Sequence, residues 1–541
     1  MSRVASARLL LGEHESPSRC LLPIIFAYVC SFSTTLPLFL DGRSILYCCV
    51  AAIPLSVFIY AVLLLLSRVS LCVQGDRFKG NLRLFLFAAG SLMVVWGIAF
   101  LVLFPGCFST DSNDILKMVW GMPFESSWFR YGALNSHHPA FYVFLNYLAV
   151  RLGELLGFGQ MGCASIAAFM HAVTLACCCG FVVCEANNLF GKRLVVLFCW
   201  AFFFFDPLLT WYSVTVWKDV VFSGTLLCFS MLLVEAFLRP DDFAAKRWKA
   251  VLLVVFAVAS SLLRSNGFIA IGLSLLVACF AMSGLARKTM VRLTACVVAL
   301  FFVVAGPVYG LAHVAPAHFS ETVGVPLQQI SRTVHEGGTI SEEDEAYLSK
   351  LLPMDEWRDS YSPGTPNPLK FSDDFNDSVL EEDKLRFVLC WIEIGIENPG
   401  CYLRAWIAQT RDYWSLDSNT WYTVTAGYDL GYGKEANGHL GQILTSEDLE
   451  VALSSVIEAF SFLFSIGFLA WSMLGGLLIG FLKGHRRSLM FFLPFVSLWA
   501  TFLLAAPAAD FRYMLSLHLA FPLFFLFAFW DFDAERKGSL V

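Results

Sequence analysis

Two aspartates, Asp111 and Asp114, follow directly after a long apolar run. A carboxylate at the surface of a membrane can accept a proton from a hydroxyl group while it stays close to lipid-borne substrates. The neighbouring Thr110, Asp111 and Ser112 are also good helix caps, so a purely structural role at a helix start is the competing interpretation. The spacing by itself is compatible with both roles.

The same polar loop ends with two histidines, His137 and His138, in front of Pro139. Proline is favoured in the first turn of a helix, and the free backbone N–H groups of that turn form a natural anion site. The histidines add hydrogen-bond donors and, when protonated, positive charge. We therefore expect a phosphate here rather than a metal ion, because two adjacent histidines cannot easily aim at one ion. An ordinary polar loop is the alternative.

Other charged groups stand at the ends of later apolar runs: Lys218-Asp219, Arg264-Ser265-Asn266-Gly267 and Asp510-Phe511-Arg512-Tyr513. Taken alone, each charged side chain could simply extend from the end of a membrane span to the aqueous interface. Together with the aspartates and histidines of the first loop, they are predicted to lie on one side of the membrane. Carboxylates for a hydroxyl and cations for a phosphate favour transfer from a lipid phosphate to an acceptor alcohol.

The chain that positions these residues is too apolar for a water-soluble protein. Of its 541 residues 57% are hydrophobic and 15% are charged, with 52 Phe and 15 Trp, whereas soluble domains carry about 25% charged residues. No single water-soluble core can absorb that much apolar surface. This excludes a cytosolic enzyme, a disordered protein and a nucleic-acid binder, and leaves an integral membrane protein with many spans.

Twelve apolar runs of roughly spanning length are predicted to cross the membrane, near 21–40, 45–66, 84–104, 161–186, 194–213, 219–238, 250–264, 267–285, 290–312, 456–482, 488–506 and 511–530. A thirteenth candidate, 139–157, contains Asn146, Arg151 and Glu154, which favour an interfacial or partly inserted helix. Most of the 17 cysteines lie in apolar runs as small hydrophobes. Cys390 and Cys401 could form a disulfide, although spacing alone cannot establish its geometry.

Basic clusters in short loops predict which side faces the cytoplasm. They divide the chain into four parts: a cytoplasmic N-terminus with two extra transmembrane helices (1–83), a transmembrane core (84–312) with an external loop at 105–138, an acidic extracytoplasmic domain (313–455), and C-terminal transmembrane helices with a cytoplasmic tail (456–541). Residues 313–455 hold 24 acidic and nine basic residues. We expect this domain to be mainly helical, with helices at 342–352, 380–397 and 400–414.

At these residues the chain resembles the GT-C superfamily of polytopic membrane glycosyltransferases, and most of all an uncharacterised bacterial branch with a "PG-x-x-S-x-D-S" loop followed by "HHP". Here the motifs read Pro105-Gly106-Cys107-Phe108-Ser109-Thr110-Asp111-Ser112 and His137-His138-Pro139. The Lys218, Arg264 and Arg512 segments match in order, as does Val325-Pro326-Leu327-Gln328-Gln329-Ile330. The resemblance runs from about residue 84 to 530.

The resemblance implies an all-α polytopic fold of about 12–13 transmembrane helices and a polyprenyl-phosphate-linked sugar donor. The sugar would pass, with inversion, to an acceptor hydroxyl on a cell-envelope glycan, lipid or protein at the outer face of the cell membrane. Asp111 is implied as the general base and Asp219 as a second carboxylate. The substrate would be held by residues of several segments: His137, His138, Lys218, Arg264, Asn266, Gln328, Gln329 and Arg512.

Two questions stay open at this stage. Some relatives use a divalent metal; the sequence has no obvious metal motif, yet Asp111 and Asp219 could bind Mg²⁺ or Mn²⁺ through a few oxygens. The rival functions are a flippase or transporter of a lipid-linked cell-envelope precursor, for which inverted repeats would be expected, and an oligosaccharide polymerase or ligase. A one-sided pocket below an external domain would favour a transferase, and a central cavity open to both sides would favour transport.

Overall fold

The computed structural model describes residues 17–69, 71, 76–122, 134–417, 446–505 and 508–532, so residues 1–16 and 533–541 at the two ends, and parts of the predicted external loop 105–138 and acidic domain 313–455, lie outside it. Within these ranges all regular secondary structure is helical, joined by three isolated bridges. Among the described residues, seven helical segments are long and apolar enough to cross a membrane, or up to eight if a bent pair counts as one span. The chain is an all-α polytopic membrane protein, as its composition predicts.

The seven segments are α2 with η1 (Leu21–Phe39), α3 (Ile45–Arg68), α4 (Asn81–Val102), α7 (Gln160–Phe190), α10 (Lys218–Leu238), α14 with η2 and α15 (Gly284–Leu311), and η7 with α26 (Phe511–Phe529). The bent pair is α8 (Arg193–Phe205) and α9 (Pro207–Ser213), which meet at 64°. Every one of the twelve predicted runs is helical in the structure.

Several of the predicted spans are shorter than the approximately 20 residues that a crossing helix needs. They are α12 (Arg247–Leu263), α13 (Ser265–Ala281), α24 (Ile466–Leu482) and α25 (Leu493–Ala505). The thirteenth candidate is a separate helix of 16 residues, α6 (Ala140–Leu155), which packs between α5 and α7. These five helices are therefore too short to count as membrane-spanning by the length criterion that the seven segments meet.

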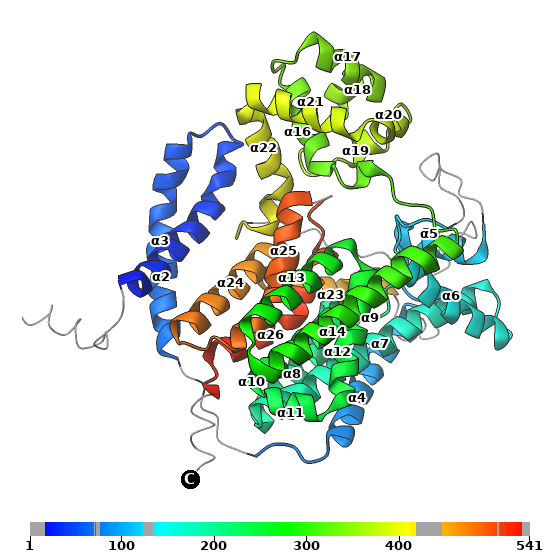
Figure 1. Ribbon diagram of the computed structural model, residues 1–541, viewed down its shortest axis with the longest axis vertical. Helices are drawn as coiled ribbons and strands as arrows, with labels where there is room; N and C mark the ends of the chain where they lie inside the picture. The colour runs from blue at the N-terminus through cyan, green and yellow to red at the C-terminus, as the bar shows by residue number, and fades with distance from the viewer. Residues whose placement is uncertain are drawn as a thin grey trace, which may run out of the picture.

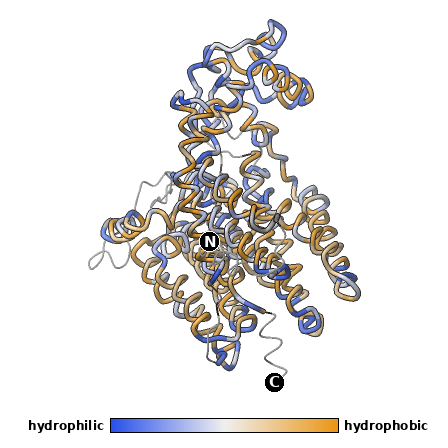
Figure 2. The backbone as a smooth tube through the Cα atoms, turned by 90° about the vertical axis from the view of Figure 1, so that its left-hand side faces the viewer, coloured by the Kyte–Doolittle hydropathy of each residue, from blue (hydrophilic) through white to orange (hydrophobic). Residues whose placement is uncertain are grey.

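Helix α10 is the most deeply buried of the seven segments and packs against α7, α12 and α26 (Figure 1). Its most apolar window is 94% buried, whereas that of α14 is only 6% buried. Helices α2 and α3 form a hairpin at the side of the bundle. The helices with exposed apolar faces are those expected to contact lipid, and the tube in Figure 2 is correspondingly apolar below and more polar above.

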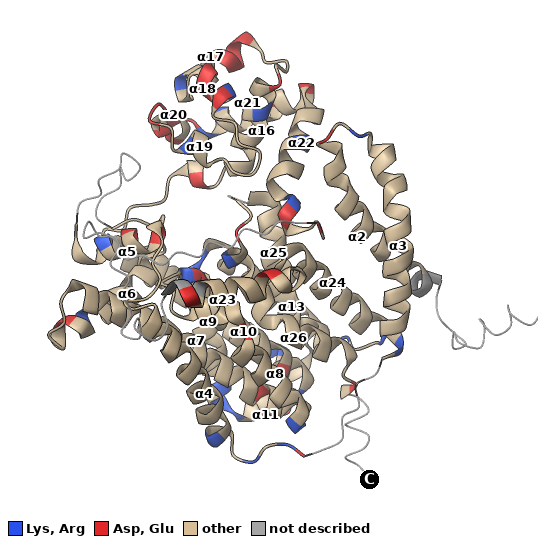
Figure 3. Cartoon of the chain, turned by 180° about the vertical axis from the view of Figure 1, so that it is seen from behind, with Lys and Arg blue, Asp and Glu red and all other residues tan. Residues whose placement is uncertain are grey.

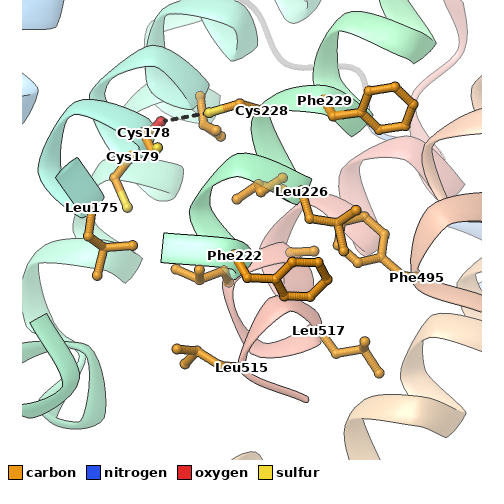
Figure 4. Packing of buried hydrophobic residues seen from close by; sticks show 14 of the residues in the cluster. Leu175, Cys178, Cys179, Phe222, Leu226, Cys228, Phe229, Phe495, Leu515 and Leu517 are labelled. Carbon is orange, nitrogen blue, oxygen red and sulfur yellow. Dashed lines mark hydrogen bonds between the residues drawn. The ribbon is translucent and has the colours of Figure 1, made fainter. Parts of the chain in front are cut away.

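The close packing around α10 uses small and sulfur-containing side chains (Figure 4). Cys178 of α7 contacts Cys228 of α10, whose thiol donates to the carbonyl of Cys178 at 3.6 Å. Gly224 of α10 faces the same stretch of α7, since a Cβ there would lie 3.1 Å from Cys178 and 3.5 Å from Leu175. All described cysteines are free thiols, as expected for small hydrophobes. Cys390 and Cys401 are among them and do not form the disulfide considered above.

Gly267 of α13 packs directly against the backbone of α12 at Ser260. A Cβ atom at this position would lie 2.3 Å from the carbonyl oxygen of Ser260 and 2.7 Å from the ring of Phe222. We expect Gly267→Ala to lower the free energy of unfolding by about 1–3 kcal/mol, because the helices cannot separate freely. Thermal unfolding of the detergent-purified protein tests this. Gly272→Ala, on the same helix with no atom within 4 Å, is the control, and equal melting temperatures would contradict the prediction.

Above the bundle lies a helical domain, here called the cap, that spans residues 319–397 and has its own hydrophobic core. It contains η3 (Phe319–Glu321), α16 (Gly324–His335), α17 (Glu342–Leu351), α18 (Met354–Asp359), α19 (Asn367–Lys370), α20 (Asp377–Glu382) and α21 (Lys384–Glu397). Helix α22 (Pro399–Thr410) returns the chain to the bundle. Acidic side chains gather on the cap helices, and basic ones mark the opposite end of the molecule (Figure 3).

The helices predicted within the acidic domain are present. Residues 342–352 correspond to α17, 380–397 to the second half of α20 and all of α21, and 400–414 to α22 with η4. The break before α22 falls at Asn398, whose side-chain oxygen accepts from the backbone N–H of Thr339 at 2.9 Å. Helices α16 and α18 were not predicted. In α18 only Trp357 is buried, so it offers little periodic signal, whereas Leu327, Ile330 and Val334 of α16 have helical spacing and could have been recognised.

Candidate active site

Helix α5 (Thr110–Trp120) presents Asp111 and Asp114 on one face, since residues three apart on a helix are neighbours. Its N-cap is Ser109, which forms a reciprocal capping box with Ser112. Capping is thus done by Ser109, which leaves Asp111 for another role. The preceding Gly106 has φ +123°, and a Cβ there would meet Ala168 at 2.4 Å, which explains the glycine of the motif.

Short hydrogen bonds fix α5 against the start of α10. The hydroxyl of Ser112 donates to the carbonyl of Val216 at 2.8 Å, and the indole N–H of Trp217 donates to Ser109 Oγ at 2.6 Å. Backbone bonds of Cys107 to Val214 and Val216 complete the contact. These bonds bring Lys218, the first residue of α10, to the same region as Asp111, although the two are far apart in the sequence.

Arg512 joins the last membrane helix to α5. Its Nη1 lies 2.8 Å from Asp111 Oδ2 and its Nε lies 3.0 Å from Asp510 Oδ2. The guanidinium also lies 4.9 Å from the centre of the Trp217 ring. Two carboxylates and an aromatic face therefore hold one planar cation in place.

Arg264 is the second fixed cation. It lies in the extended link between α12 and α13 and is paired with the buried Asp219. The ring of Tyr513 lies between the two arginines, 4.8 Å from the Arg264 guanidinium and 5.1 Å from that of Arg512. An aromatic ring attracts both cations by its negative face, so it offsets part of their mutual repulsion.

The charge state of Asp111 is set by these cations. Burial pushes the pKa of the Asp111 carboxyl upward, but Arg512, His138, Lys218 and His137 outweigh it and hold that pKa well below its usual range. Asp111 is therefore ionised throughout the physiological pH range.

The two histidines contribute less positive charge than the sequence suggests. Burial is the main reason that the pKa values of His137 and His138 lie below the usual value, and the charge of Lys218 lowers both further. The two rings are 4.8 Å apart, and His137 Nδ1 lies 3.8 Å from Glu321 Oε1 of the cap. At neutral pH the positive charge of the site therefore comes from lysines and arginines, namely Lys117, Lys218, Arg264, Lys370 and Arg512, of which Lys370 is paired with Glu321 of the cap.

These side chains border a cavity of about 1350 Å³ between the bundle and the cap. Of the residues predicted from the sequence, its walls include Asp111, His137, Lys218, Arg264, Asn266 and Arg512. Apolar residues of α14, η2 and α25, among them Phe301, Ala305 and Phe502, form another part of the wall, and the cap contributes Glu321 and Lys370. The cavity thus combines cationic, acidic and apolar surfaces.

Four predicted site residues are not part of the cavity wall. Asp219 and His138 are each 1% exposed and lie behind Arg264 and His137. Gln328 and Gln329 lie inside the cap, where Gln329 Oε1 accepts from the Trp391 indole at 2.8 Å and Gln328 donates to the carbonyl of Ser362. The two glutamines thus connect α16 to other segments of the cap by hydrogen bonds, which is a structural role.

The two carboxylates considered as alternative metal ligands, Asp111 and Asp219, are each paired with a different arginine. Asp219 is paired with Arg264, while Asp111 is paired with Arg512, so each carboxylate already faces a guanidinium. In the part of the chain that the structure describes, no group of three or more His, Cys, Asp or Glu side chains could hold an ion. This donor set does not fit Mg²⁺ or Mn²⁺.

Several residues of the site were not singled out from the sequence. Trp217 precedes Lys218 and Tyr513 follows Arg512 in the sequence. Their position next to a predicted site residue was the signal that could have identified them. Glu321 and Lys370, whose charged atoms are 2.7 Å apart, had no local signal, because only the fold of the cap carries them to the cavity.

Comparisons with known proteins give little beyond a family. No match is found among curated proteins. Among solved structures, the crystal structure of ArnT from Cupriavidus metallidurans bound to undecaprenyl phosphate is similar over 84% of this chain and 78% of that chain, with 14% sequence identity and a TM-score of 0.30. A likeness of this extent does not establish a common fold. Residues 130–539 match the description "Family of unknown function (DUF6020)", and the chain belongs to this family.

Proposed function

We propose that the protein is a GT-C-like membrane glycosyltransferase, which moves a sugar from a polyprenyl-phosphate donor to an acceptor hydroxyl on the extracytoplasmic face, with inversion. The observation that supports this most is the combination of surfaces in one cavity. Lys218, Arg264 and Arg512 suit a phosphate, the walls of α14 and α25 suit an apolar chain, and the carboxylates of α5 suit a hydroxyl. A polyprenyl-phosphate sugar supplies the phosphate and the apolar chain, and the acceptor supplies the hydroxyl group.

The cations act on the leaving group. When the bond between the anomeric carbon and the phosphate oxygen breaks, its electron pair stays on the phosphate, and fixed positive groups stabilise that charge. Arg512 and Arg264 are held by carboxylates and aromatic rings before substrate arrives, so little reorganisation is needed. Lys218 forms no ion pair with any described residue and is available to the phosphate.

The acceptor oxygen attacks the anomeric carbon from the face opposite the phosphate and loses its proton to a carboxylate. Asp111 and Asp114, both in the cavity wall, are the two carboxylates that α5 supplies for this step. Asp219 does not reach the cavity, so we assign it the positioning of Arg264. The acceptor is a cell-envelope glycan, lipid or protein, and it would enter between the bundle and the cap.

A flippase or transporter and an oligosaccharide polymerase or ligase are the other candidates. The predicted charged groups collect at one end of the bundle beneath the cap, which supports transfer at one face over passage across the membrane. The basic loops at the opposite end support an extracytoplasmic site. A polymerase would use the same lipid-linked chemistry, and its acceptor would itself be a glycan.

The direct test is to incubate the purified protein with a panel of undecaprenyl-phosphate monosaccharides and membranes of the producing cells. Release of undecaprenyl phosphate with transfer of the sugar to a membrane component is the expected result. Protein in liposomes that moves the intact sugar lipid between leaflets without cleaving it would contradict the proposal and support a flippase.

A further inference from the structure

Asp114 is a carboxylate of the cavity wall that is not ion-paired with any described cation. It is 9% exposed, borders the cavity and forms no hydrogen bond or ion pair with any described residue. Its neighbours on α5 differ in this respect: Ser112 is bonded to Val216, and Asp111 is bonded to Arg512. Its carboxylate therefore meets only the cavity, where water or a bound hydroxyl group supplies the hydrogen-bond donors that the protein does not.

We propose that Asp114, on the face of α5 that borders the cavity, is the general base of the transfer reaction, while Asp111 positions Arg512. The inference rests on the proposed function. The acceptor oxygen forms a bond to the anomeric carbon, the bond from that carbon to the phosphate oxygen breaks, and the electron pair leaves with the phosphate. The acceptor hydroxyl proton moves to the Asp114 carboxylate.

Geometry distinguishes the two aspartates. One oxygen of Asp111 is already engaged by a charged guanidinium, which weakens its attraction for a proton. The carboxylate of Asp114 is one helical turn further along α5 and has its lone pairs available for an incoming hydroxyl. The capping box and the hydrogen bond from Ser112 to Val216 fix the start of α5. The different surroundings of Asp111 and Asp114 are therefore set by a rigid helix.

Electrostatics supports the same assignment. Burial raises the pKa of Asp114 to about 6, Lys117 opposes this shift, and the charge of Asp111 adds to it. A base acts best when its pKa lies near the working pH, and the pKa of Asp111 is far below that range. Because the Asp114 pKa is raised, its carboxylate is present above about pH 6 and protonated below it.

The groups that face this carboxylate come from several elements. Lys117 and Asp111 lie on its own helix, and α6, which packs against α5, has only Arg151 and Glu154 as charged residues, paired with each other. Around the same cavity, other elements contribute His137, Lys218, Arg264, Glu321, Lys370 and Arg512. None of these is bonded to Asp114.

The experiment compares Asp114→Asn, Asp114→Glu and Asp111→Asn, with Asp241→Asn, an exposed carboxylate of α11 (Pro240–Ala245), as the control. Transfer from undecaprenyl-phosphate monosaccharides is measured from pH 4.5 to 8.5, and binding of undecaprenyl phosphate is measured separately. We expect Asp114→Asn to lower kcat/KM by about 10²–10⁴-fold with unchanged affinity for undecaprenyl phosphate. The wild-type acid limb near pH 6 should be lost with Asp114→Asn and displaced with Asp114→Glu.

Asp111→Asn should weaken lipid phosphate binding but keep the acid limb. If wild-type protein transfers sugar while Asp114→Asn stays within threefold of it, the assignment of the base is overturned and the proposed function stands. An acid limb that does not move in Asp114→Glu, or a loss of lipid phosphate binding in Asp114→Asn, would equally overturn it, because either result describes a structural role. A wild-type protein with no transfer from any donor would overturn the proposed function itself.

Discussion

Replacing Arg512 by Met should lower the affinity for undecaprenyl phosphate by about 10–100-fold, the loss expected for a charge-assisted hydrogen bond of roughly 1.5–3 kcal/mol. Transfer should fall further, by about 10²–10³-fold, because a fixed positive group is worth most when charge develops on the leaving phosphate. Arg512 carries this weight since Asp111, Asp510 and the ring of Trp217 hold its guanidinium in one orientation. Binding titrations and initial rates of transfer measure the two effects.

Two further variants make this prediction specific. Arg512→Lys keeps the charge but loses the planar fork, so it should recover part of the binding and little of the rate. Arg287→Met removes an exposed arginine of α14 and should change neither. Full transfer activity in Arg512→Met would contradict the assignment of this residue to the phosphate.

A second large effect is expected at the opposite end of α10, where Lys249 lies completely buried between two carboxylates. Its Nζ is 2.7 Å from Glu185 of α7 and 2.6 Å from Glu235 of α10. Lys249→Met leaves two buried acids without a counter-ion, and breaking such a pair costs about 3–5 kcal/mol. The variant should therefore show a much lower melting temperature and a low yield of folded protein.

The cause can be separated from the simple loss of a lysine. Adding Glu185→Gln and Glu235→Gln to Lys249→Met removes the unpaired charges and should restore most of the stability. Lys246→Met, at an exposed position beside the same helix start, should have no effect. If the triple variant is no more stable than Lys249→Met, packing rather than charge would be the cause.

Lys249, Glu185 and Glu235 form a buried triad that is remote from the candidate active site. It lies about 25 Å from Lys218 along α10, at a rise of 1.5 Å per residue. No sequence motif draws attention to Glu185 or Glu235, since each is one acid in a long apolar helix. Surviving folded protein of the triple variant should bind undecaprenyl phosphate as the wild type does, because none of its residues borders the cavity.

Composition and periodicity by themselves determined the class of the protein. Long apolar runs must be helices in a bilayer, where every backbone polar group needs an internal partner. The same reasoning placed the helices of the acidic segment, including the break at Asn398. The sequence also predicted that Asp111, Lys218, Arg264 and Arg512 belong together, and the structure brings these four to one cavity.

Only the tertiary structure decided which of these groups face substrate and which face protein. Sequence gives the residue type, but pairing depends on packing between distant elements: Arg264 covers Asp219, Arg512 engages Asp111, and the cap takes up Gln328 and Gln329. It also decided that Asp114 keeps its carboxylate without a partner among the described residues and that Lys370 reaches the cavity. The physical reason is that a buried charge is least unfavourable beside an opposite charge. The tertiary fold decides which oppositely charged side chain is brought close enough to pair with it.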